Sequence, residues 1–187
     1  MSNAQQSERP APAMARPRPA SQRGLTMVEV MVTLAISAVL VGVAAPSLAD
    51  LMHADRVRSA SLELWGLLTE ARAEAVKRNA PVLVCPSNDG ASCLPAPTAN
   101  SWSGIKIACY DVDGNGQCDA STAGSPNPIR VRNAPDRSVQ LHGPTSVVRF
   151  NGPGSAAHGV TFTLTAGSGG SKSSTIVVTA NGSVRSE

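Results

Sequence analysis

The stretch RGLTMVEVMVTLAISAVLVGVAAPSL, residues 23–48, is an apolar run with one acid near its start, Glu29. Residues 30–49 carry no formal charge, and 20 such residues span about 30 Å as a helix, which is the hydrocarbon thickness of a bilayer. The run therefore predicts a membrane-spanning helix. A carboxylate at membrane depth is costly, so Glu29 requires a partner or a function.

The flanks of the run indicate a retained anchor rather than a cleaved secretory signal. A secretory signal has a shorter apolar stretch and a small-residue cleavage site, and Pro46 interrupts the one candidate, VAAPSLAD. Four arginines precede the run and Asp50 follows it. The positive-inside rule then predicts that residues 1–24 are cytoplasmic and that the rest lies outside.

Residues 50–80 are predicted to continue the helix as an amphipathic segment, because apolar residues recur there at spacings of three and four. Glu74 and Arg78 form a favourable i, i+4 pair, and Pro81 is predicted to end the helix near Asn79. A single helix of about 55 residues is thus expected from Leu25 onward. Its buried face is predicted to contain Leu51, Ala54, Val57, Ala60, Leu64, Leu68, Ala71 and Ala75.

The start of the run resembles the class III signal of type IV pilins and type II secretion pseudopilins. Gly24 precedes the apolar run, Glu29 is the fifth residue after it and Pro46 is the twenty-second. The resemblance implies that prepilin peptidase cleaves between Gly24 and Leu25 and that Leu25 becomes N-methylated. Most family members have Phe at the first mature position, where this chain has Leu25.

The same resemblance implies roles for Glu29 and Pro46 in filament assembly. In pilins the acid pairs with the N-terminal amine of a neighbouring subunit, so an insertion penalty becomes a means of setting the register between subunits. Pro46 removes a helical hydrogen bond and bends the chain. Implied partners are prepilin peptidase, other major and minor pilins or pseudopilins, and the inner membrane. The mature chain would be a single-pass inner-membrane protein with a periplasmic head, incorporated into a pilus or pseudopilus.

Residues 81–187 predict a β-rich head. Short apolar or alternating runs are separated by Gly, Pro, Asn and Ser, which is typical of antiparallel strands. The expected fold is α+β, with the long helix packed on one antiparallel sheet. The layout resembles the GspH/FimT group of minor pilins. The predicted strands are VLVC (82–85), IKIACY (105–110), IRVR (129–132), SVQL (138–141), VVRF (147–150), VTFTLT (160–165) and TIVVTA (175–180).

The four cysteines form two local pairs by spacing, Cys85 with Cys93 and Cys109 with Cys118. An exported head meets an oxidising compartment, which favours disulfides. Of the three possible connectivities we favour the two local bonds, because each closes a loop that contains turn formers. A zinc site of four thiolates is the alternative, although the closely spaced Cys-x2-Cys pairs typical of such sites are absent.

The segment DVDGNGQCD, residues 111–119, matches the beginning of a calcium-binding loop. Asp111, Asp113 and Asn115 stand at its first, third and fifth positions, with Gly116 at the sixth. The twelfth position needs a bidentate Glu and holds Thr122. The motif is therefore incomplete, and we expect a structural turn rather than a metal site, with calcium as the alternative.

Charge gives little general support for nucleic-acid binding. Past Gly24, twelve Lys and Arg face twelve Asp and Glu, although residues 120–187 are locally basic. Some FimT members bind DNA through a tail resembling Gly-Arg-x-Arg, and residues 182–185 of this chain lack its first arginine. We expect weak binding at most, with candidate contacts at Arg130, Arg132, Lys172 and Arg185.

No catalytic motif is visible, since His53, His142 and His158 are isolated and no phosphate-binding loop or metalloprotease helix occurs. We therefore expect no enzymatic activity and no cofactor. The favoured hypothesis is a FimT/GspH-like minor pilin that takes part in type IV pilus assembly, initiation or the tip complex. The alternatives are a minor pseudopilin of a type II secretion system and a DNA-binding minor pilin for natural transformation.

Overall fold

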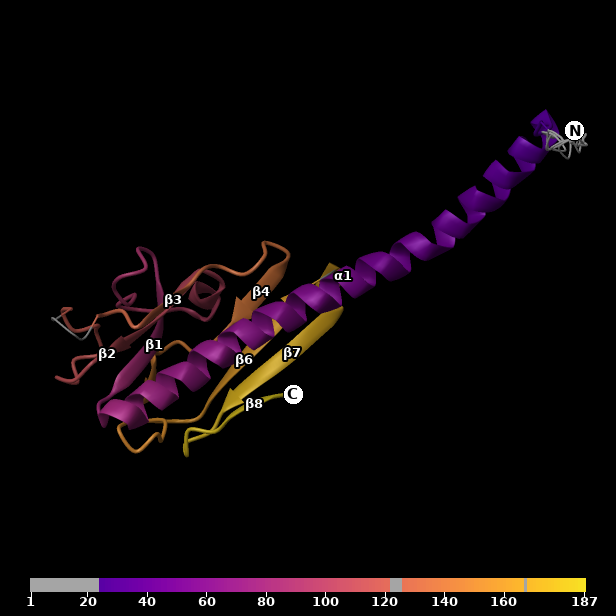
Figure 1. Ribbon diagram of the computed structural model, residues 1–187. Coiled ribbons are helices and arrows are strands. Elements are labelled where there is room, and N and C mark those ends of the chain that lie inside the picture. The colour runs from indigo at the N-terminus through magenta and orange to yellow at the C-terminus, as the bar shows by residue number, and fades with distance from the viewer. Residues whose placement is uncertain (1–23, 122–125, 167) are drawn as a thin grey trace, which may run out of the picture. The chain divides into compact units, whose positions relative to one another are not determined.

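The computed structural model describes residues 24–121, 126–166 and 168–187, without the side chains of 43–46 and 168. The chain divides into two compact units, residues 1–42 and 43–187, and each is described by itself. One helix, α1 (Met27–Arg78), contributes to both units (Figure 1). The prediction of a single long helix is confirmed, with its first residue two positions later than expected.

In the first unit, every described residue is exposed. An 18-residue window of α1 has a mean hydropathy of 2.3, and no residue of that window is buried. By length and composition, α1 is the one helix among the described residues that could cross a membrane. An apolar helix exposed on all sides would have to be covered by lipid or by other subunits.

The C-terminal end of α1 has a local cause. Asn79 has φ +48°, a left-handed conformation that Asn tolerates better than most residues. The N–H of Ala80 donates to the carbonyl of Ala75 at 3.2 Å, and that of Asn79 donates to Val76 at 3.3 Å. Pro81 follows directly. These bonds satisfy carbonyls at the end of the helix, so the predicted ending near Asn79 is confirmed.

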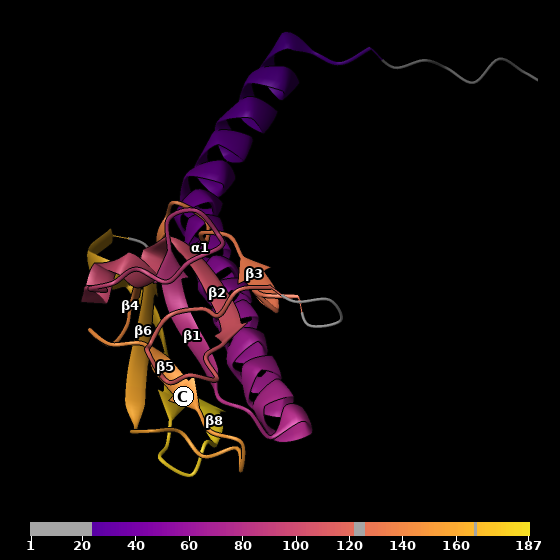
Figure 2. The same ribbon diagram turned by 90° about the vertical axis from the view of Figure 1, so that its left-hand side faces the viewer.

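The head contains two four-stranded antiparallel sheets, where the sequence predicted one. Sheet A has the order β3-β2-β1-β5 (Figure 2), and sheet C has the order β4-β6-β7-β8 (Figure 1). Sheet A contains β1 (Val82–Ser87), β2 (Ile105–Tyr110), β3 (Arg130–Arg132) and β5 (Val148–Phe150). Sheet C contains β4 (Val139–His142), β6 (Val160–Ala166), β7 (Lys172–Val178) and β8 (Val184–Ser186). Two short 3-10 helices, η1 (Ala99–Ser103) and η2 (Ser168–Gly170), complete the described elements.

One apolar cluster joins α1 to both sheets. The predicted helix face is largely correct, but Leu51 is 58% exposed, and the buried stripe begins at Val57. Leu67 also enters the core, although the predicted face omitted it. The buried apolar residues of α1 are Val57, Leu64, Leu67, Leu68, Ala71 and Ala75.

Strands β1 and β2 of sheet A are buried on both faces, which explains why they read as nearly continuous apolar runs. Val82 and Val84 face the main core. Leu83 and Ile107 face a second cluster on the opposite side, which includes the cysteines. The disulfides therefore cover the face of sheet A that α1 does not.

Trp102, in η1, fills the centre of the main core. Its side chain is fully buried and packs edge to face on Phe162 with ring centroids 4.8 Å apart. Its indole Nε1 donates to the carbonyl of Pro144 at 2.7 Å. In a chain with only 3% aromatic residues, one large side chain thus ties η1 to sheet C.

We predict that Trp102→Phe lowers the free energy of unfolding of the head by about 1–3 kcal/mol, because it removes buried volume and the bond to Pro144. Urea unfolding of residues 53–187, which include every buried residue described, measures the change. Trp65→Phe is the matched control. Trp65 is 41% exposed, so a change within about 0.5 kcal/mol is expected. Equal losses in the two variants would contradict the assigned role of Trp102.

Candidate assembly segment and charged sites

The expected cleavage site lies in an accessible segment ahead of α1. Gly24 and Leu25 are exposed and non-helical, and a Cβ added at Gly24 would meet nothing within 4 Å. A peptidase needs an accessible backbone, and this segment is exposed and lies outside the helix. Arg23 lies outside the described residues. Cleavage and methylation here remain predictions.

Glu29 lies in the first turn of α1. Its backbone N–H donates to the hydroxyl of Thr26 at 3.2 Å, so Thr26 caps the helix in the way that a Thr-x-x-Glu sequence favours. The side chain of Glu29 is exposed within this single chain. Its carboxylate is therefore placed to accept a partner from outside. Pro46 lies within α1, and its side chain is outside the described ones.

The cysteines form the two local disulfides that the spacing favoured, Cys85–Cys93 and Cys109–Cys118. Cys85 lies on β1 and Cys109 on the neighbouring β2. The two bonds stack on one another, because the sulfur of Cys93 lies 4.0 Å from that of Cys109 and 3.7 Å from that of Cys118. All four sulfurs thus lie close together, but they are bonded in pairs rather than arranged as free thiols.

The acidic loop is organised around a buried ion pair. Asp111 is fully buried, and Arg149 on β5 approaches its carboxylate at 2.9 Å. The backbone N–H of Gly116 lies 3.3 Å from both carboxylate oxygens. Burial raises the pKa of Asp111 above its usual value, and the charge of Arg149 opposes that shift. The sequence did not predict this pair.

The candidate calcium ligands serve the loop itself. Carboxylate oxygens of Asp111, Asp113 and Asp119 lie within 4.8 Å of one another. However, the N–H of Asn115 donates to Asp113 at 3.1 Å, and that of Val112 donates to Asp119 at 2.8 Å. Thr122 lies outside the described residues. This hydrogen bonding, with Arg149 on Asp111, favours the structural turn over the calcium alternative.

Two of the four candidate DNA contacts are held by an acid of α1. Arg130 and Arg132 flank Val131 on β3, and both reach the carboxylate of Glu70. The Arg132–Glu70 distance is 3.6 Å. Cations that are already paired release fewer counterions on binding a phosphate backbone, so their contribution to DNA binding is reduced.

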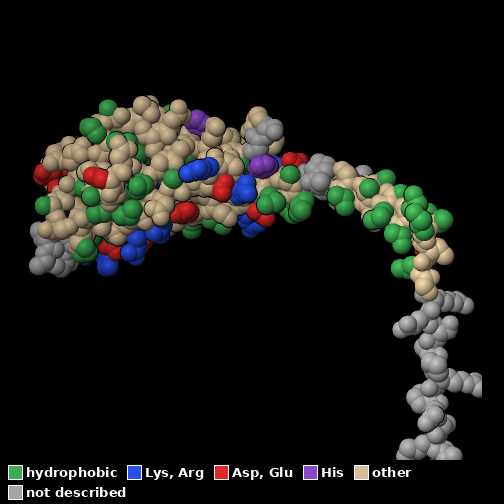
Figure 3. Space-filling view, turned by 90° about the horizontal axis from the view of Figure 1, so that it is seen from above, with side chains coloured by type: hydrophobic (Ala, Val, Ile, Leu, Met, Phe, Trp, Pro, Cys, Tyr) green, Lys and Arg blue, Asp and Glu red, His purple; other side chains and the backbone are tan. Residues whose placement is uncertain are grey.

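The other two cations lie on opposite faces of sheet C. Lys172 pairs with Ala166, which points into the core, and its ammonium lies 3.8 Å from Asp50 of α1. Arg185 neighbours the inward-facing Val184, so strand alternation places it on the outer face. Figure 3 shows Lys and Arg side chains interspersed with Asp and Glu on the visible face of the head (Figure 3). The structure thus does not bring the four candidate cations together.

Comparisons with known proteins give the family. The model of the family described as type II transport protein GspH matches residues 60–182, and that of the prokaryotic N-terminal methylation motif matches residues 19–45. The chain belongs to the GspH family. The GspH match begins within α1 and includes every strand except β8. The methylation motif includes Gly24, Leu25 and Glu29.

Among solved structures, the chain is similar to the type IV minor pilin FimU of Pseudomonas aeruginosa PAO1. The crystal form in space group P21 is 14% identical, with a TM-score of 0.52, and the match covers 71% of this chain and 89% of that one. The form in space group P65 is 15% identical, with a TM-score of 0.48 and coverages of 70% and 91%. At this identity the P21 likeness shows a shared pilin fold. A search of curated proteins gave no match.

Within the GspH-matched region, sequence reasoning missed a contact around the last hairpin. Gly182, which aligned with the DNA-binding tail, has φ +81°, and a Cβ there would lie 1.8 Å from the carbonyl oxygen of Gly154. The guanidinium of Arg72 donates to that carbonyl at 2.9 Å and to Asn181 at 3.3 Å. Gly182 is therefore needed for packing. The sequence signal that could have predicted this hairpin is the pair Asn181-Gly182, because Asn-Gly is a common hairpin turn.

We predict that Arg149→Leu lowers the free energy of unfolding of the head by about 2–4 kcal/mol at pH 7, because Asp111 is left buried and unpaired. Without Arg149, the pKa of Asp111 rises further. A carboxyl whose pKa is raised in the fold contributes stability at low pH, which is lost as the pH rises through that pKa. The deficit should therefore be smaller at pH 4 than at pH 7 in urea unfolding.

The double variant Arg149→Leu with Asp111→Asn is the matched control. It removes the charge while keeping an acceptor for Gly116, and we expect it to recover stability and to lose the pH dependence. A deficit of the same size at pH 4 and pH 7 in the single variant would show that Arg149 acts by packing alone.

We predict that residues 53–187 shift DNA weakly at ~50 mM salt and not at ~200 mM, because few separated cations give only the non-specific contribution to binding. A gel-shift titration at both salt concentrations measures this. Lys172→Gln should have no more effect than Arg137→Gln, a control at an exposed cation outside the candidate set. A shift that persists at ~200 mM and disappears in Arg185→Gln would restore the DNA-receptor hypothesis.

Proposed function

We propose that the chain is a minor pilin that takes part in assembly of a type IV pilus, at initiation or in the tip complex. The single observation that carries the proposal is the arrangement of its first turn. An accessible Gly24–Leu25 bond precedes an apolar helix whose first turn holds one acid, Glu29, and the same helix continues into a GspH head. In a fibre built from helices that leave a membrane, the Gly24–Leu25 bond would be the cleavage site, Glu29 would pair with a neighbouring subunit and the apolar helix would form the core.

The proposed organisation follows from this arrangement. Prepilin peptidase removes residues 1–24, residues 25–49 form the membrane span and later the filament core, and residues 50–80 continue as the amphipathic segment. Residues 81–187 form the periplasmic head. The precursor is a single-pass inner-membrane protein, and the mature chain joins other pilins. Glu29 then pairs with the methylated amine at position 25 of a neighbour.

We also propose that the head has no enzymatic activity. Among the described residues, His158 contacts a hydroxyl, that of Ser146, at 3.2 Å. Both side chains lie at the surface, and no carboxylate is bonded to the imidazole in the described chain. A Ser–His pair without an orienting group or a shaped cavity lacks the arrangement that nucleophilic catalysis requires.

The second candidate is a minor pseudopilin of a type II secretion system. The observation that favours it is the GspH match over residues 60–182. Both machines would use the same anchor and the same acid, so the helix does not discriminate between them. The distinction rests on the phenotype of a deletion strain, in which loss of twitching supports the pilus and loss of protein secretion supports the pseudopilus.

We predict that Glu29→Ala leaves membrane insertion intact and lowers incorporation into sheared filaments by about tenfold or more, since losing a buried charge pair costs several kcal/mol. Complementation of the deletion strain, followed by immunoblots of membrane and filament fractions, measures both quantities. Asp113→Ala, in the exposed acidic loop, is the control and should assemble normally. Full incorporation of Glu29→Ala would remove the assembly role of the acid.

A further inference from the structure

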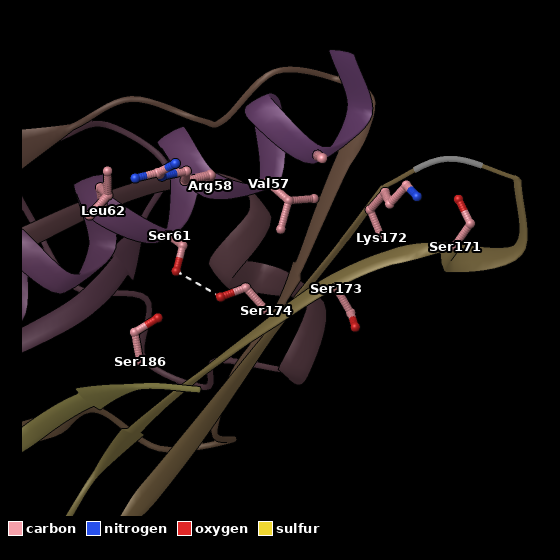
Figure 4. Close-up of a pocket in the computed structure, with 10 residues that line it drawn as sticks. Val57, Arg58, Ser61, Leu62, Ser171, Lys172, Ser173, Ser174 and Ser186 are labelled. Atoms are coloured by element: carbon pink, nitrogen blue, oxygen red, sulfur yellow. Dashed lines mark hydrogen bonds between the residues drawn. The ribbon is translucent and has the colours of Figure 1, made fainter. Parts of the chain in front are cut away.

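A groove between α1, β7 and β8 is rich in hydroxyl groups but lacks a group that could activate them. It has a volume of about 470 Å³. Ser61 and Ser174 bond each other across it at 3.0 Å (Figure 4). Its described lining residues include no His, Asp or Glu, so no base stands beside a hydroxyl there. A reactive group with a carboxylate beside it occurs instead in the acidic loop, residues 111–119.

The sequence Asn-Gly occurs three times in the chain, at residues 115–116, 151–152 and 181–182. In such a pair the amide nitrogen of Gly can attack the side-chain carbonyl carbon of Asn, because Gly has no Cβ to hinder the approach. Ammonia leaves, a cyclic succinimide forms, and water opens the ring to Asp or isoaspartate. The overall reaction consumes water, releases ammonia and adds a carboxyl group. The three pairs share this local chemistry, so the fold decides which of them reacts.

The three pairs differ first in the room beside the glycine. A Cβ added at Gly116 would meet nothing within 4 Å. At Gly182 it would overlap a backbone carbonyl oxygen, and at Gly152 it would overlap the side chain of Asn79. Ring closure moves the backbone between Asn and Gly, so close neighbours oppose it. Of the three pairs, the exposed Asn115 and its glycine have the room for this movement.

The pairs differ also in the group that accepts the glycine N–H. The N–H of Gly116 faces the carboxylate of Asp111, with both oxygens at 3.3 Å. The N–H of Gly182 instead donates to the carbonyl of Thr179 at 2.8 Å. A carboxylate can take up the proton that the nitrogen loses as it attacks, and a carbonyl cannot. Burial raises the pKa of Asp111 against the opposing charge of Arg149, which makes the carboxylate a stronger base.

The side chain of Asn115 is oriented by two further contacts within the loop. Its carbonyl oxygen accepts from the N–H of Gln117 at 2.7 Å, and its amide nitrogen donates to Asp113 at 2.8 Å. The first contact stabilises the negative charge that develops on the oxygen as the carbon is attacked. Asn181 accepts a corresponding bond from Ser183 at 3.0 Å. That pair therefore has the same turn contact but lacks the room and the carboxylate.

We propose that Asn115 is a site of spontaneous deamidation, in which Gly116 supplies the attacking nitrogen and Asp111 takes up its proton. This inference does not depend on the proposed function in a fibre. The product places a carboxylate beside Asp113, where an amide donated before, so like charges replace a hydrogen bond. The disulfide of Cys118 still closes the loop, which confines the change to the surface. The loop thus gains negative charge with time and without an enzyme.

The test is mass spectrometry of the full chain, kept in detergent with its disulfides intact and incubated at neutral pH in water enriched in heavy oxygen. Only an Asn that converts during the incubation takes up the heavy oxygen. Digestion in ordinary water at acidic pH, followed by backbone fragmentation, locates each label and separates Asp from isoaspartate. We expect Asn115 to convert at least about tenfold faster than Asn151 and Asn181, because a positioned base contributes that much or more.

The same chain, reduced and unfolded in urea, is the reference state. There the three rates should agree to within about twofold, because the contacts that distinguish the pairs are lost. Conversion of Asn115 no faster than that of Asn151 and Asn181 in the folded chain would overturn the proposal. An equal advantage of Asn115 in the unfolded chain would overturn it too, since the flanking sequence would then be the cause.

The double variant Arg149→Leu with Asp111→Asn tests the base, because it removes the carboxylate and keeps an acceptor for Gly116. We expect conversion of Asn115 to slow about tenfold or more. Arg137→Gln, at an exposed cation, is the control and should leave the rate unchanged. A loosened fold would raise the rate, so slowing cannot result from misfolding. A rate that stays the same or rises in the double variant overturns the role of Asp111.

Discussion

The fold of the head depends on one apolar stripe of α1 that both sheets share. Val57, Leu64, Leu68 and Ala75 belong to the same cluster as the inward side chains of sheets A and C. Each sheet has only four strands, and a small twisted sheet needs a partner layer to bury its apolar face. The helix supplies that layer for both sheets, and Trp102 fills the centre of the shared core. The disulfides contribute on the far side of sheet A, where no helix packs among the described elements.

Several cations of the head are bound by groups of the same chain. Arg149 neutralises the buried Asp111, and Arg72 binds two carbonyls of the last hairpins. Lys106 on β2 is almost fully buried and donates to three carbonyls, and burial lowers its pKa to about 8. These cations stabilise the fold. Within the locally basic residues 120–187, Arg130, Arg132 and Arg149 likewise pair with acids of the same chain.

Local pattern predicted the long helix, its end and the positions of most strands, because these depend on residues close together in the sequence. It did not predict the division into two sheets. β5 pairs with β1, more than 60 residues earlier, rather than with its sequence neighbours. β8 is three residues long and depends on the hairpin at Gly182. The sequence likewise did not predict that the four candidate DNA contacts lie apart, because strand alternation and sheet membership decide which face each one occupies.

The first turn of α1 shows how an acid can be tolerated before assembly and still favour it. The backbone of Glu29 is capped by Thr26, and an acid near a helix N-terminus gains about 0.3–1 kcal/mol from the helix dipole. Insertion of a charged residue into a bilayer costs about 2.5–3.5 kcal/mol. In the proposed membrane setting, the helix therefore offsets part of the cost and leaves a remainder of about 2 kcal/mol, roughly 30-fold in an equilibrium constant. A cation supplied by a neighbouring subunit would relieve that remainder, so the residual penalty becomes a driving force for joining the fibre.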